Sequence, residues 1–476
     1  MHDLMIASDR PATGTLDVHS PYDGRVLDTI ATGGVEHVDD ALGVAHALFR
    51  DKSRWLSIPE RIAILSKTTE IMRGQIEELT LLAASEGGKP YTDSRVEVVR
   101  AINGVELCIE ALRGDPGSVI PLSTTQATTG RVAFTQKEPI GVVVAVSAFN
   151  HPLNLIVHQV GPAVASGCPV VVKPAADTPL SCLRFVQILR EAGLPDAFCQ
   201  VLIADSREAS ESLVVDARVS FFSFIGSAKV GWMLKSKLAP GARAALEHGG
   251  VAPMVIAEPF NRDVAIPALL KAGFYHAGQV CVSVQRIYAP STLAASLAEE
   301  IAERAKKLVV GAPEDPATEV GPLIRHAETD RIAGWVDEAV ADGATLLTGG
   351  KKISGSCYEP TVLLNPPADA KVSTMEIFGP VVCVYGYDDI DEAVASANSL
   401  PVAFQAGVFC DDIDTAMHLY RQLDASAVMI NDTTAFRDDV MPFAGLRESG
   451  LGVGGIPYTM EDMQIDKMMV IKSPKL

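Results

Sequence analysis

The stretch Gly141-Val142-Val143-Val144-Ala145-Val146 decides the fold, because it begins a region in which short apolar runs alternate with helical patterns. The later runs are Val170–Val172, Gln200–Ile203 and Val219–Phe224, and the helical patterns between them cover Leu155–Ala165, Pro179–Ala192 and Ser206–Val214. Continuous apolar strands that alternate with helices indicate a parallel sheet covered on both faces. Such sheets bind nucleotides where the strands end and the helices begin.

The flanking regions extend this pattern in both directions. Residues 1–115 are predicted to be mainly helical, with apolar residues at helical spacing in Val38–Phe49, Pro59–Glu86 and Arg95–Leu112. A second α/β set is predicted toward the C-terminus, with helices Ala265–Ala272, Ala294–Lys307, Thr329–Asp342 and Ile390–Asn398 and strands Gln285–Tyr288, Thr345–Leu347, Val381–Tyr387 and Ala427–Asn431.

Two further segments have β character but no obvious neighbour. Residues 121–137 are predicted to form a two-stranded ribbon with a turn near Gly130, and the tail Lys467–Lys472 a terminal strand. An isolated hairpin is only marginally stable, and an exposed apolar strand promotes aggregation. We therefore expect both segments to pair with another element or another subunit.

The composition is that of an ordinary globular protein. The 476 residues are 48% hydrophobic and 21% charged, and the length suggests two or three domains. The formal net charge of −19, without a run of Lys and Arg, argues against nucleic acid or anionic lipid as the main partner. The sequence has no apolar stretch of membrane-spanning length and no secretory signal, and its eight scattered cysteines favour reduced thiols over disulfides or a metal site. We expect a cytoplasmic protein.

Three segments offer residues for covalent catalysis. Gly278-Gln279-Val280-Cys281 supplies a soft nucleophile, and Leu246-Glu247-His248-Gly249-Gly250 supplies a carboxylate that could activate water. Asn150 follows a strand and could donate a hydrogen bond to an oxyanion. Taken singly, a buried thiol, a solvated acid and a turn-capping asparagine explain these residues equally well. Together they indicate oxidation of an aldehyde through a thioester.

A nucleotide site is predicted in Phe224-Ile225-Gly226-Ser227-Ala228-Lys229-Val230-Gly231, which follows a strand and opens a helix. Gly226 would let the backbone approach a phosphate, and the free N–H groups of the helix would attract it. The stretch is not the G-x-G-x-x-G fingerprint, so a tight turn without a ligand is an equal alternative. Lys173, at the end of another strand, lies where ribose hydroxyls would be, although most such lysines are simply solvated.

These residues occur in an order that resembles the aldehyde dehydrogenase superfamily over nearly the whole chain. The order is Asn150, Lys173, Gly226-Ser227, Glu247, Cys281 and Glu376-Ile377-Phe378-Gly379-Pro380. Near the C-terminus, Pro442-Phe443-Ala444-Gly445-Leu446-Arg447-Glu448-Ser449-Gly450 is similar to the family's Pro-Phe-Gly-Gly-x-Lys-x-Ser-Gly.

The resemblance implies a catalytic role for three residues. Cys281 is the nucleophile, Asn150 and the Cys281 backbone N–H form the oxyanion hole, and Glu247 is the base for thioester hydrolysis. Cys281 would attack the aldehyde, hydride would pass to NAD(P)⁺, and water activated by Glu247 would release a carboxylate.

The resemblance also implies how the cofactor is held. Lys173 and Glu376 would bind its riboses, Ser227 its pyrophosphate, and Phe378 would pack near the nicotinamide. Many NAD-preferring members carry a glutamate three residues past the lysine, where this chain has Ala176. Cofactor choice therefore stays open between NAD, favoured by its prevalence, and NADP.

The implied architecture is an α/β fold in three parts. A Rossmann-like cofactor domain would comprise residues 1–120 and 139–248, and an α/β catalytic domain residues 249–440. Residues 121–138 and 455–476 would form a β oligomerisation element, with 441–454 returning to the cofactor domain. A homodimer or homotetramer is expected.

The substrate is predicted from His151, which directly follows Asn150. It resembles a branch of the family that oxidises small aldehydes with a phosphonate, phosphate or sulfonate group, and lactaldehyde. His151 and Arg100 look like the phosphonate-binding residues of phosphonoacetaldehyde dehydrogenases, but Val280 stands where those enzymes have an arginine. Phosphonoformaldehyde, sulfolactaldehyde and a neutral hydroxyaldehyde remain as candidates. Arg437 could add a further cation, although pairing with its neighbouring aspartates is the expected role.

Three rival functions are compatible with parts of the sequence. A CoA-acylating dehydrogenase of the same fold would release the thioester to CoA, but such enzymes commonly lack the hydrolytic glutamate. A non-catalytic structural or binding member of the family is disfavoured by the intact set of Asn150, Glu247 and Cys281. An anion-binding module without chemistry would require the nucleotide features to be accidental.

Overall fold

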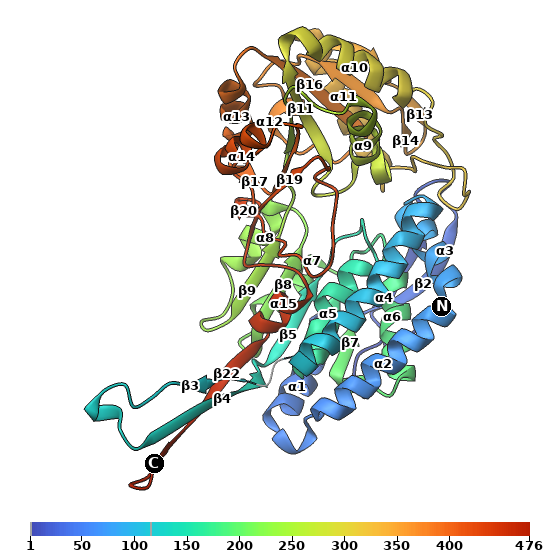
Figure 1. Cartoon of the computed structure of the whole chain (residues 1–476). Coiled ribbons are helices and arrows are strands. Elements are labelled where there is room, and N and C mark those ends of the chain that lie inside the picture. Colours follow the sequence, from blue (N-terminus) through green and yellow to red (C-terminus); the bar gives the residue numbers. More distant parts are fainter. Residues whose placement is uncertain (1, 115–116) are drawn as a thin grey trace.

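The computed structural model describes residues 2–114 and 117–476, so residues 1, 115 and 116 of the expected cofactor segment 1–120 lie outside the described residues. Figure 1 shows two α/β regions, one above the other, and a β ribbon that extends away from the lower region. Each region is built on one large sheet with helices against it. The protein is of the α/β class, as the sequence predicted.

The lower region contains a six-stranded sheet in the order β21-β9-β8-β5-β6-β7. Its strands are β5 (Val142–Val146), β6 (Val170–Lys173), β7 (Cys199–Val201), β8 (Val219–Ile225), β9 (Arg243–Glu247) and β21 (Gly450–Leu451). Neighbouring strands are parallel except for β21 and β9. Along β5, Val143 and Ala145 join one apolar cluster while Val142 and Val144 join another, because side chains alternate across a strand. The predicted parallel sheet with two covered faces is confirmed.

The helices of this region separate into two layers. The first layer is α1 (Val35–Arg50), α7 (Arg207–Val215) and α8 (Ala228–Lys235). The second is α2 (Ile58–Gly74), α3 (Ile76–Gly87), α4 (Tyr91–Gly114), α5 (Asn154–Ser166), α6 (Leu180–Glu191) and α15 (Ile456–Asp462). The single helix predicted over Pro59–Glu86 is in fact α2 and α3, which meet at Gln75.

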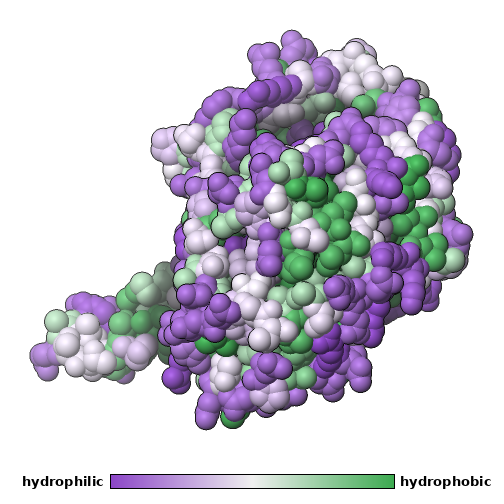
Figure 2. All heavy atoms as spheres, turned by 90° about the horizontal axis from the view of Figure 1, so that it is seen from above, coloured by the Kyte–Doolittle hydropathy of each residue, from purple (hydrophilic) through white to green (hydrophobic). Residues whose placement is uncertain are grey.

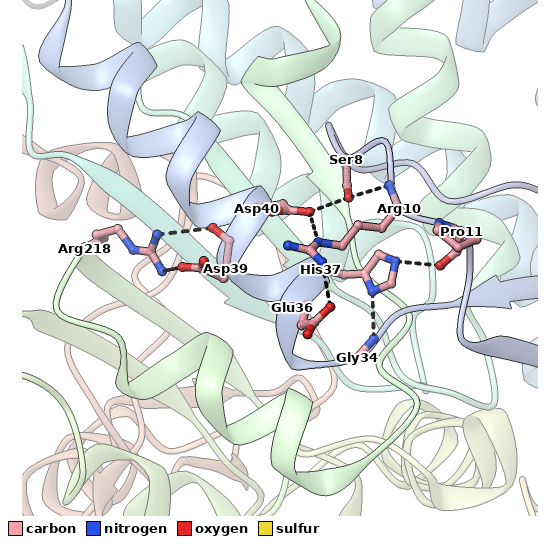
Figure 3. A network of polar contacts seen from close by, with 9 residues as sticks. All are labelled: Ser8, Arg10, Pro11, Gly34, Glu36, His37, Asp39, Asp40 and Arg218. Carbon is pink, nitrogen blue, oxygen red and sulfur yellow. Dashed lines mark hydrogen bonds and ion pairs between the residues drawn. The ribbon is translucent and has the colours of Figure 1, made fainter.

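The prediction of a mainly helical N-terminus missed a hairpin. Strands β1 (Gly14–His19) and β2 (Val26–Thr32) pair in antiparallel fashion. The segment before the hairpin is tied to α1 by polar contacts, which Figure 3 shows from close by. Arg10 contacts Glu36 and Asp40 at 2.7 and 2.8 Å, and on the other side of the helix Arg218 contacts Asp39 at 2.7 Å. These charges attach the N-terminal segment and the start of β8 to the first turns of α1.

The upper region contains a seven-stranded sheet in the order β12-β15-β16-β11-β10-β18-β19. Its strands are β10 (Ala252–Ile256), β11 (Val284–Pro290), β12 (Thr345–Thr348), β15 (Thr361–Leu364), β16 (Val381–Tyr387), β18 (Gln405–Phe409) and β19 (Ala427–Ile430). Its helices are α9 (Arg262–Phe274), α10 (Ser291–Ala305), α11 (His326–Ala341), α12 (Lys371–Thr374), α13 (Ile390–Asn398) and α14 (Ile413–Gln422). Two small sheets pair β13 (Lys352–Ser354) with β14 (Cys357–Tyr358) and β17 (Val402–Ala403) with β20 (Leu446–Arg447). Strands β10, β15 and β18 were not predicted.

The ribbon differs from its prediction. Residues Thr124–Thr129 form no strand, so the hairpin predicted to turn near Gly130 is wrong. Instead β4 (Arg131–Pro139) pairs with the terminal strand β22 (Gln464–Lys472) from Arg131–Lys472 to Pro139–Gln464, and only the short β3 (Val119–Ile120) lies on its other side. The terminal strand therefore has the partner it was expected to need. Figures 1 and 2 show this ribbon standing clear of the body.

Among the helices that the structure describes, none has both the length and the apolar character of a membrane span.

Candidate active site

A cavity of about 940 Å³ lies where the two α/β regions face each other. The last residues of β5, β6, β8 and β9 line it, namely Val146, Lys173, Ile225 and Glu247. This is the edge at which parallel sheets bind nucleotides. All the predicted site residues line this cavity except Gly231.

Gly231 has a packing role instead. It is buried on α8, and a Cβ atom there would lie 2.0 Å from Cε1 of His248. The His248 ring sits between Phe224 and Trp232, and its Nδ1 is 2.9 Å from the Gly226 carbonyl oxygen. His248 thus fastens α8 to the end of β9.

Cys281 lies in the loop between α9 and β11, and it is partly exposed whereas the other seven cysteines are buried. The loop approaches it through a strained turn, since His276 and Ala277 have φ values of 48° and 52°. Gln279 anchors the turn: its side-chain amide donates to Pro322 and accepts from the Ile324 backbone N–H. The nucleophile candidate is therefore held on a rigid loop.

The Cys281 thiol is not ionised by its surroundings. Burial raises its pKa, and the carboxylates of Glu376 and Glu247 raise it further, while Arg437 has the opposite effect. A thiol must lose its proton before it can attack a carbonyl, and these surroundings oppose that loss.

Glu247 ends β9 at the same cavity and is suited to be a general base. Burial raises its pKa to about 7. Its carboxylate occupies the space beside Gly454, where a Cβ atom would lie 2.1 Å from Oε1. A carboxylate with a pKa near neutrality can both accept and release a proton.

Asn150 is placed beside the nucleophile loop. Its Nδ2 donates to the carbonyl oxygen of Gln279 at 2.9 Å, and its side chain is buried. A side-chain amide has two N–H donors, so the second remains for a substrate oxygen. The three residues predicted to be catalytic are thus brought together from three distant segments.

The other end of the cavity carries polar groups that lack protein partners. Glu376 lies against Gly249, where a Cβ atom would be 1.8 Å from its Oε1, and that oxygen is buried without a hydrogen bond. Lys173 is largely buried, which lowers its pKa, and it makes no hydrogen bond or ion pair among the described residues. A buried carboxylate oxygen and a buried ammonium group without partners fit the hydroxyl groups of a ribose.

Phosphate and ring-binding features complete this end. Ser227 is the N-cap of α8, and its side chain makes no capping hydrogen bond, so the helix start is open to an anion. Phe378 packs edge-to-face on Phe149, with ring centroids 5.8 Å apart. The residues present therefore fit a dinucleotide whose reactive ring would lie toward Cys281.

The predicted substrate residues lie at the Cys281 end, but neither is a free cation. Arg100 donates from Nη2 and Nε to Asp439 at 2.6 and 3.3 Å, and Asp439 also contacts Nε2 of His158 at 2.9 Å. Burial lowers the pKa of His151 well below its ordinary value, and the charge of Lys89 contributes. His151 can therefore form hydrogen bonds but does not carry a charge at neutral pH.

Arg437 is the cation that remains available. Its expected pairing with the neighbouring aspartates is wrong, because Asp439 pairs with Arg100 and no described carboxylate lies within 4.0 Å of Arg437. It donates to the Met441 carbonyl oxygen at 2.7 Å and lies 4.4 Å from the Phe443 ring centroid. Its charge favours the ionised forms of Cys281 and Glu247, which places it at the reacting end.

The model of the aldehyde dehydrogenase family matches residues 8–469. The chain belongs to the aldehyde dehydrogenase family. A 3-sulfolactaldehyde dehydrogenase of Priestia aryabhattai is 38% identical over 412 residues, which cover 87% of this chain and 86% of that protein.

Solved aldehyde dehydrogenase structures share the whole fold. Aldehyde dehydrogenase 21 of Physcomitrella patens, in complex with the reaction product succinate, has a TM-score of 0.93 and 35% identity, covering 99% of this chain and 98% of that one. A glyceraldehyde-3-phosphate dehydrogenase of Methanocaldococcus jannaschii, complexed with NADP, has a TM-score of 0.92 and 32% identity, covering 98% of this chain and all of that one.

Sequence reasoning missed several residues that line the substrate end of this aldehyde dehydrogenase. They are Asn154, His158, Tyr275 and the Asp93–Lys271 ion pair. A signal existed for the first two, because Asn154 and His158 follow His151 at helical spacing in an otherwise apolar stretch. No local pattern marks Asp439 as the partner of Arg100, since 339 residues separate them.

Proposed function

We propose that this chain oxidises a small aldehyde carrying an anionic group to the corresponding carboxylate, with NAD(P)⁺ as the acceptor. The observation that carries the proposal is Arg437, a mostly buried cation without a carboxylate partner, beside Cys281 and Glu247. A buried charge is costly unless it is paired, so such a group is suited to an anionic ligand.

The chain's own residues would divide the chemistry as follows. Cys281 loses its thiol proton to water in the cavity, and the thiolate attacks the aldehyde carbon to form a thiohemiacetal oxyanion. The free N–H of Asn150 Nδ2 and the Cys281 backbone N–H stabilise the oxyanion. Bound NAD(P)⁺ supplies the hydride acceptor. Glu247 then takes a proton from water, whose oxygen attacks the thioester carbon, and the carboxylate leaves while the thiol is restored.

The relatives favour an anionic substrate. 3-Sulfolactaldehyde and glyceraldehyde-3-phosphate, named for two of them, and the succinate bound to the third each carry an anionic group beyond the reacting carbon. A sulfonate such as that of 3-sulfolactaldehyde is the first candidate, and a short phosphonoaldehyde the second. A neutral lactaldehyde-type substrate is the alternative, because a lactaldehyde dehydrogenase of Methanocaldococcus jannaschii is 33% identical over 460 residues.

The proposal includes both NAD⁺ and NADP⁺. Ala176 places no carboxylate beside Lys173, and the carboxylate of Asp177 is held by Arg325 at 2.5 and 2.9 Å. No free carboxylate near Lys173 would therefore repel the 2′-phosphate of NADP⁺, and both cofactors remain compatible with the site.

The test is one panel of aldehydes assayed with each cofactor. 3-Sulfolactaldehyde, succinic semialdehyde, glyceraldehyde-3-phosphate, lactaldehyde and propionaldehyde would be compared by kcat/KM, read as reduced nicotinamide. The three anionic aldehydes are expected to exceed propionaldehyde by at least about tenfold. Propionaldehyde as the best substrate would refute the anionic class, and acyl-CoA formed on adding CoA would refute hydrolysis.

We also propose the three-part division given by the family resemblance, with the β4–β22 ribbon serving a homodimer or homotetramer. The ribbon exposes Val132, Met468, Met469, Val470 and Ile471, an apolar surface on a thin projection. Burial of these side chains against another subunit would stabilise the assembly. Light scattering that gave a monomer mass at micromolar concentration would refute it.

A further inference from the structure

Helix α5 presents a row of polar side chains to the substrate end of the cavity. His151 just before the helix, Asn154 in its first turn and His158 one turn later all line the cavity. Their spacing of three and four residues places them on one face. The other faces of α5 carry apolar residues of the largest core cluster, including Ile156, Val157 and Val160.

This row is electrically neutral. Burial lowers the pKa of both His151 and His158, so neither ring is charged at neutral pH. The nearby charges of Arg100 and Asp439 are used in their own ion pair. The cavity therefore has a hydrogen-bonding wall on α5 and a separate cation at Arg437.

Asn154 is the member of this row with unused hydrogen-bonding capacity. Asn154 is only 3% exposed, and its Oδ1 is buried without a hydrogen-bond partner. The side chain as a whole makes no hydrogen bond with the described residues. His158, by contrast, is committed to Asp439, and Nε2 of His151 lies 3.3 Å from the Tyr275 hydroxyl. A buried amide without partners is unfavourable in the free protein, and a ligand group can relieve that cost.

The backbone of Asn154 is fixed by an ion pair within the core. Glu97 Oε1 accepts from the backbone N–H groups of Leu153 and Asn154, each at 2.9 Å. Its other oxygen contacts Lys89, and both side chains of that pair are fully buried. Asn154 is thus held four residues after Asn150, which in the proposed function binds the aldehyde oxygen.

We propose that Asn154 is a specificity-determining residue that binds a hydroxyl group of the substrate, close to its aldehyde carbon. The inference rests on the proposed function and narrows the substrate to an anionic hydroxyaldehyde. A primary amide and a hydroxyl group are each both donor and acceptor, so they match as a pair.

The test uses two pairs of substrates, and the two members of each pair differ only in one hydroxyl group. 3-Sulfolactaldehyde is compared with 3-sulfopropanal, and lactaldehyde with propionaldehyde, on the wild-type enzyme and on Asn154→Leu. The wild type is expected to prefer each hydroxylated member by at least about tenfold in kcat/KM, and Asn154→Leu to reduce that preference to less than about threefold. Leu155→Met, which changes a neighbouring apolar lining residue, should scale both members of each pair equally.

Two results would overturn the inference. One is a wild-type enzyme that oxidises 3-sulfopropanal as well as 3-sulfolactaldehyde, a result that does not depend on any variant. The other is an equal loss on both members of each pair in a folded Asn154→Leu. A wild type that favours propionaldehyde over 3-sulfopropanal would instead defeat the anionic proposal, while the lactaldehyde pair would still decide the role of Asn154.

Discussion

The two ends of the cavity differ in how their polar groups are satisfied. At the cofactor end, Lys173 and Oε1 of Glu376 have no protein partners among the described residues, and the start of α8 is uncapped by a side chain. At the substrate end, Arg100 and His158 are already bound to Asp439. Among the described residues, no carboxylate lies within 4.0 Å of Arg437, and Oδ1 of Asn154 has no hydrogen-bond partner.

This difference reflects the two ligands: the cofactor is shared by many enzymes, whereas the aldehyde substrate is specific to this one. The cofactor end offers several unpartnered groups at strand and helix ends, positions that any member of a dinucleotide-binding fold can use. At the substrate end, ion pairs between protein side chains determine which charges a substrate can contact, because a paired charge is no longer available to it. Its specificity therefore depends on which cation remains unpaired.

The largest expected effect is at the nucleophile, where the two ends meet. Cys281→Ala should reduce kcat by at least about four orders of magnitude, since no covalent intermediate can form. Cofactor binding should be unchanged, as measured by quenching of protein fluorescence on titration with the dinucleotide. The matched control is Cys410→Ala, a buried cysteine at the end of β18 that should retain activity. Normal turnover by Cys281→Ala would contradict the assignment.

The next effect concerns the unpaired cation. Arg437→Met should lower kcat/KM for 3-sulfolactaldehyde by roughly 10- to 100-fold, because a hydrogen bond to a charged group is worth about 1.5–3 kcal/mol. Activity on propionaldehyde should change much less. Arg325→Met removes a cation from the same cavity without touching the substrate end, so it should affect both aldehydes equally. Equal losses with Arg437→Met would show that the cation does not recognise the substrate's charge.

A smaller effect is expected from pH. Burial raises the pKa of Glu247 to about 7, and a general base acts in its ionised form. The rate of thioester hydrolysis should therefore rise as the pH increases to about 7, and fall about tenfold per unit below it. The profile of kcat with pH measures this, and Glu376→Gln should keep the inflection. An inflection near 4.5, the ordinary pKa of a glutamic acid, would mean that Glu247 is not desolvated.

The fold was predictable from sequence where strands are buried on both faces and therefore consist of continuous apolar residues. The apolar runs of β5, β6 and β8 appear in the structure within a residue or two of their predicted bounds, because continuous burial leaves a clear signal. The hairpin of β1 and β2 was missed, and the ribbon was assigned the wrong partner. The partner of β4 is β22, which is distant in the sequence, so local patterns do not reveal that pairing. Strands β1 and β2 are neighbours along the chain, but β1 is mostly exposed and therefore lacks the continuous apolar signal.

The site was predictable to the same extent. Each predicted site residue except Gly231 lines the cavity, whereas the pairing of Arg100 with Asp439 and the neutrality of His151 required the three-dimensional arrangement. The charge state of a buried side chain depends on everything packed around it. Sequence therefore located the chemistry but not the charge that the substrate meets.

The most direct test of the account is a single-turnover experiment on Glu247→Gln. If Cys281 is the nucleophile and Glu247 the hydrolytic base, this variant should form a thioester and stop. With 3-sulfolactaldehyde and excess NAD⁺ or NADP⁺, the predicted result is a burst of about one equivalent of reduced nicotinamide per subunit, followed by almost no turnover. A variant that shows no burst, or one that turns over at the wild-type rate, would contradict the division of labour between these two residues.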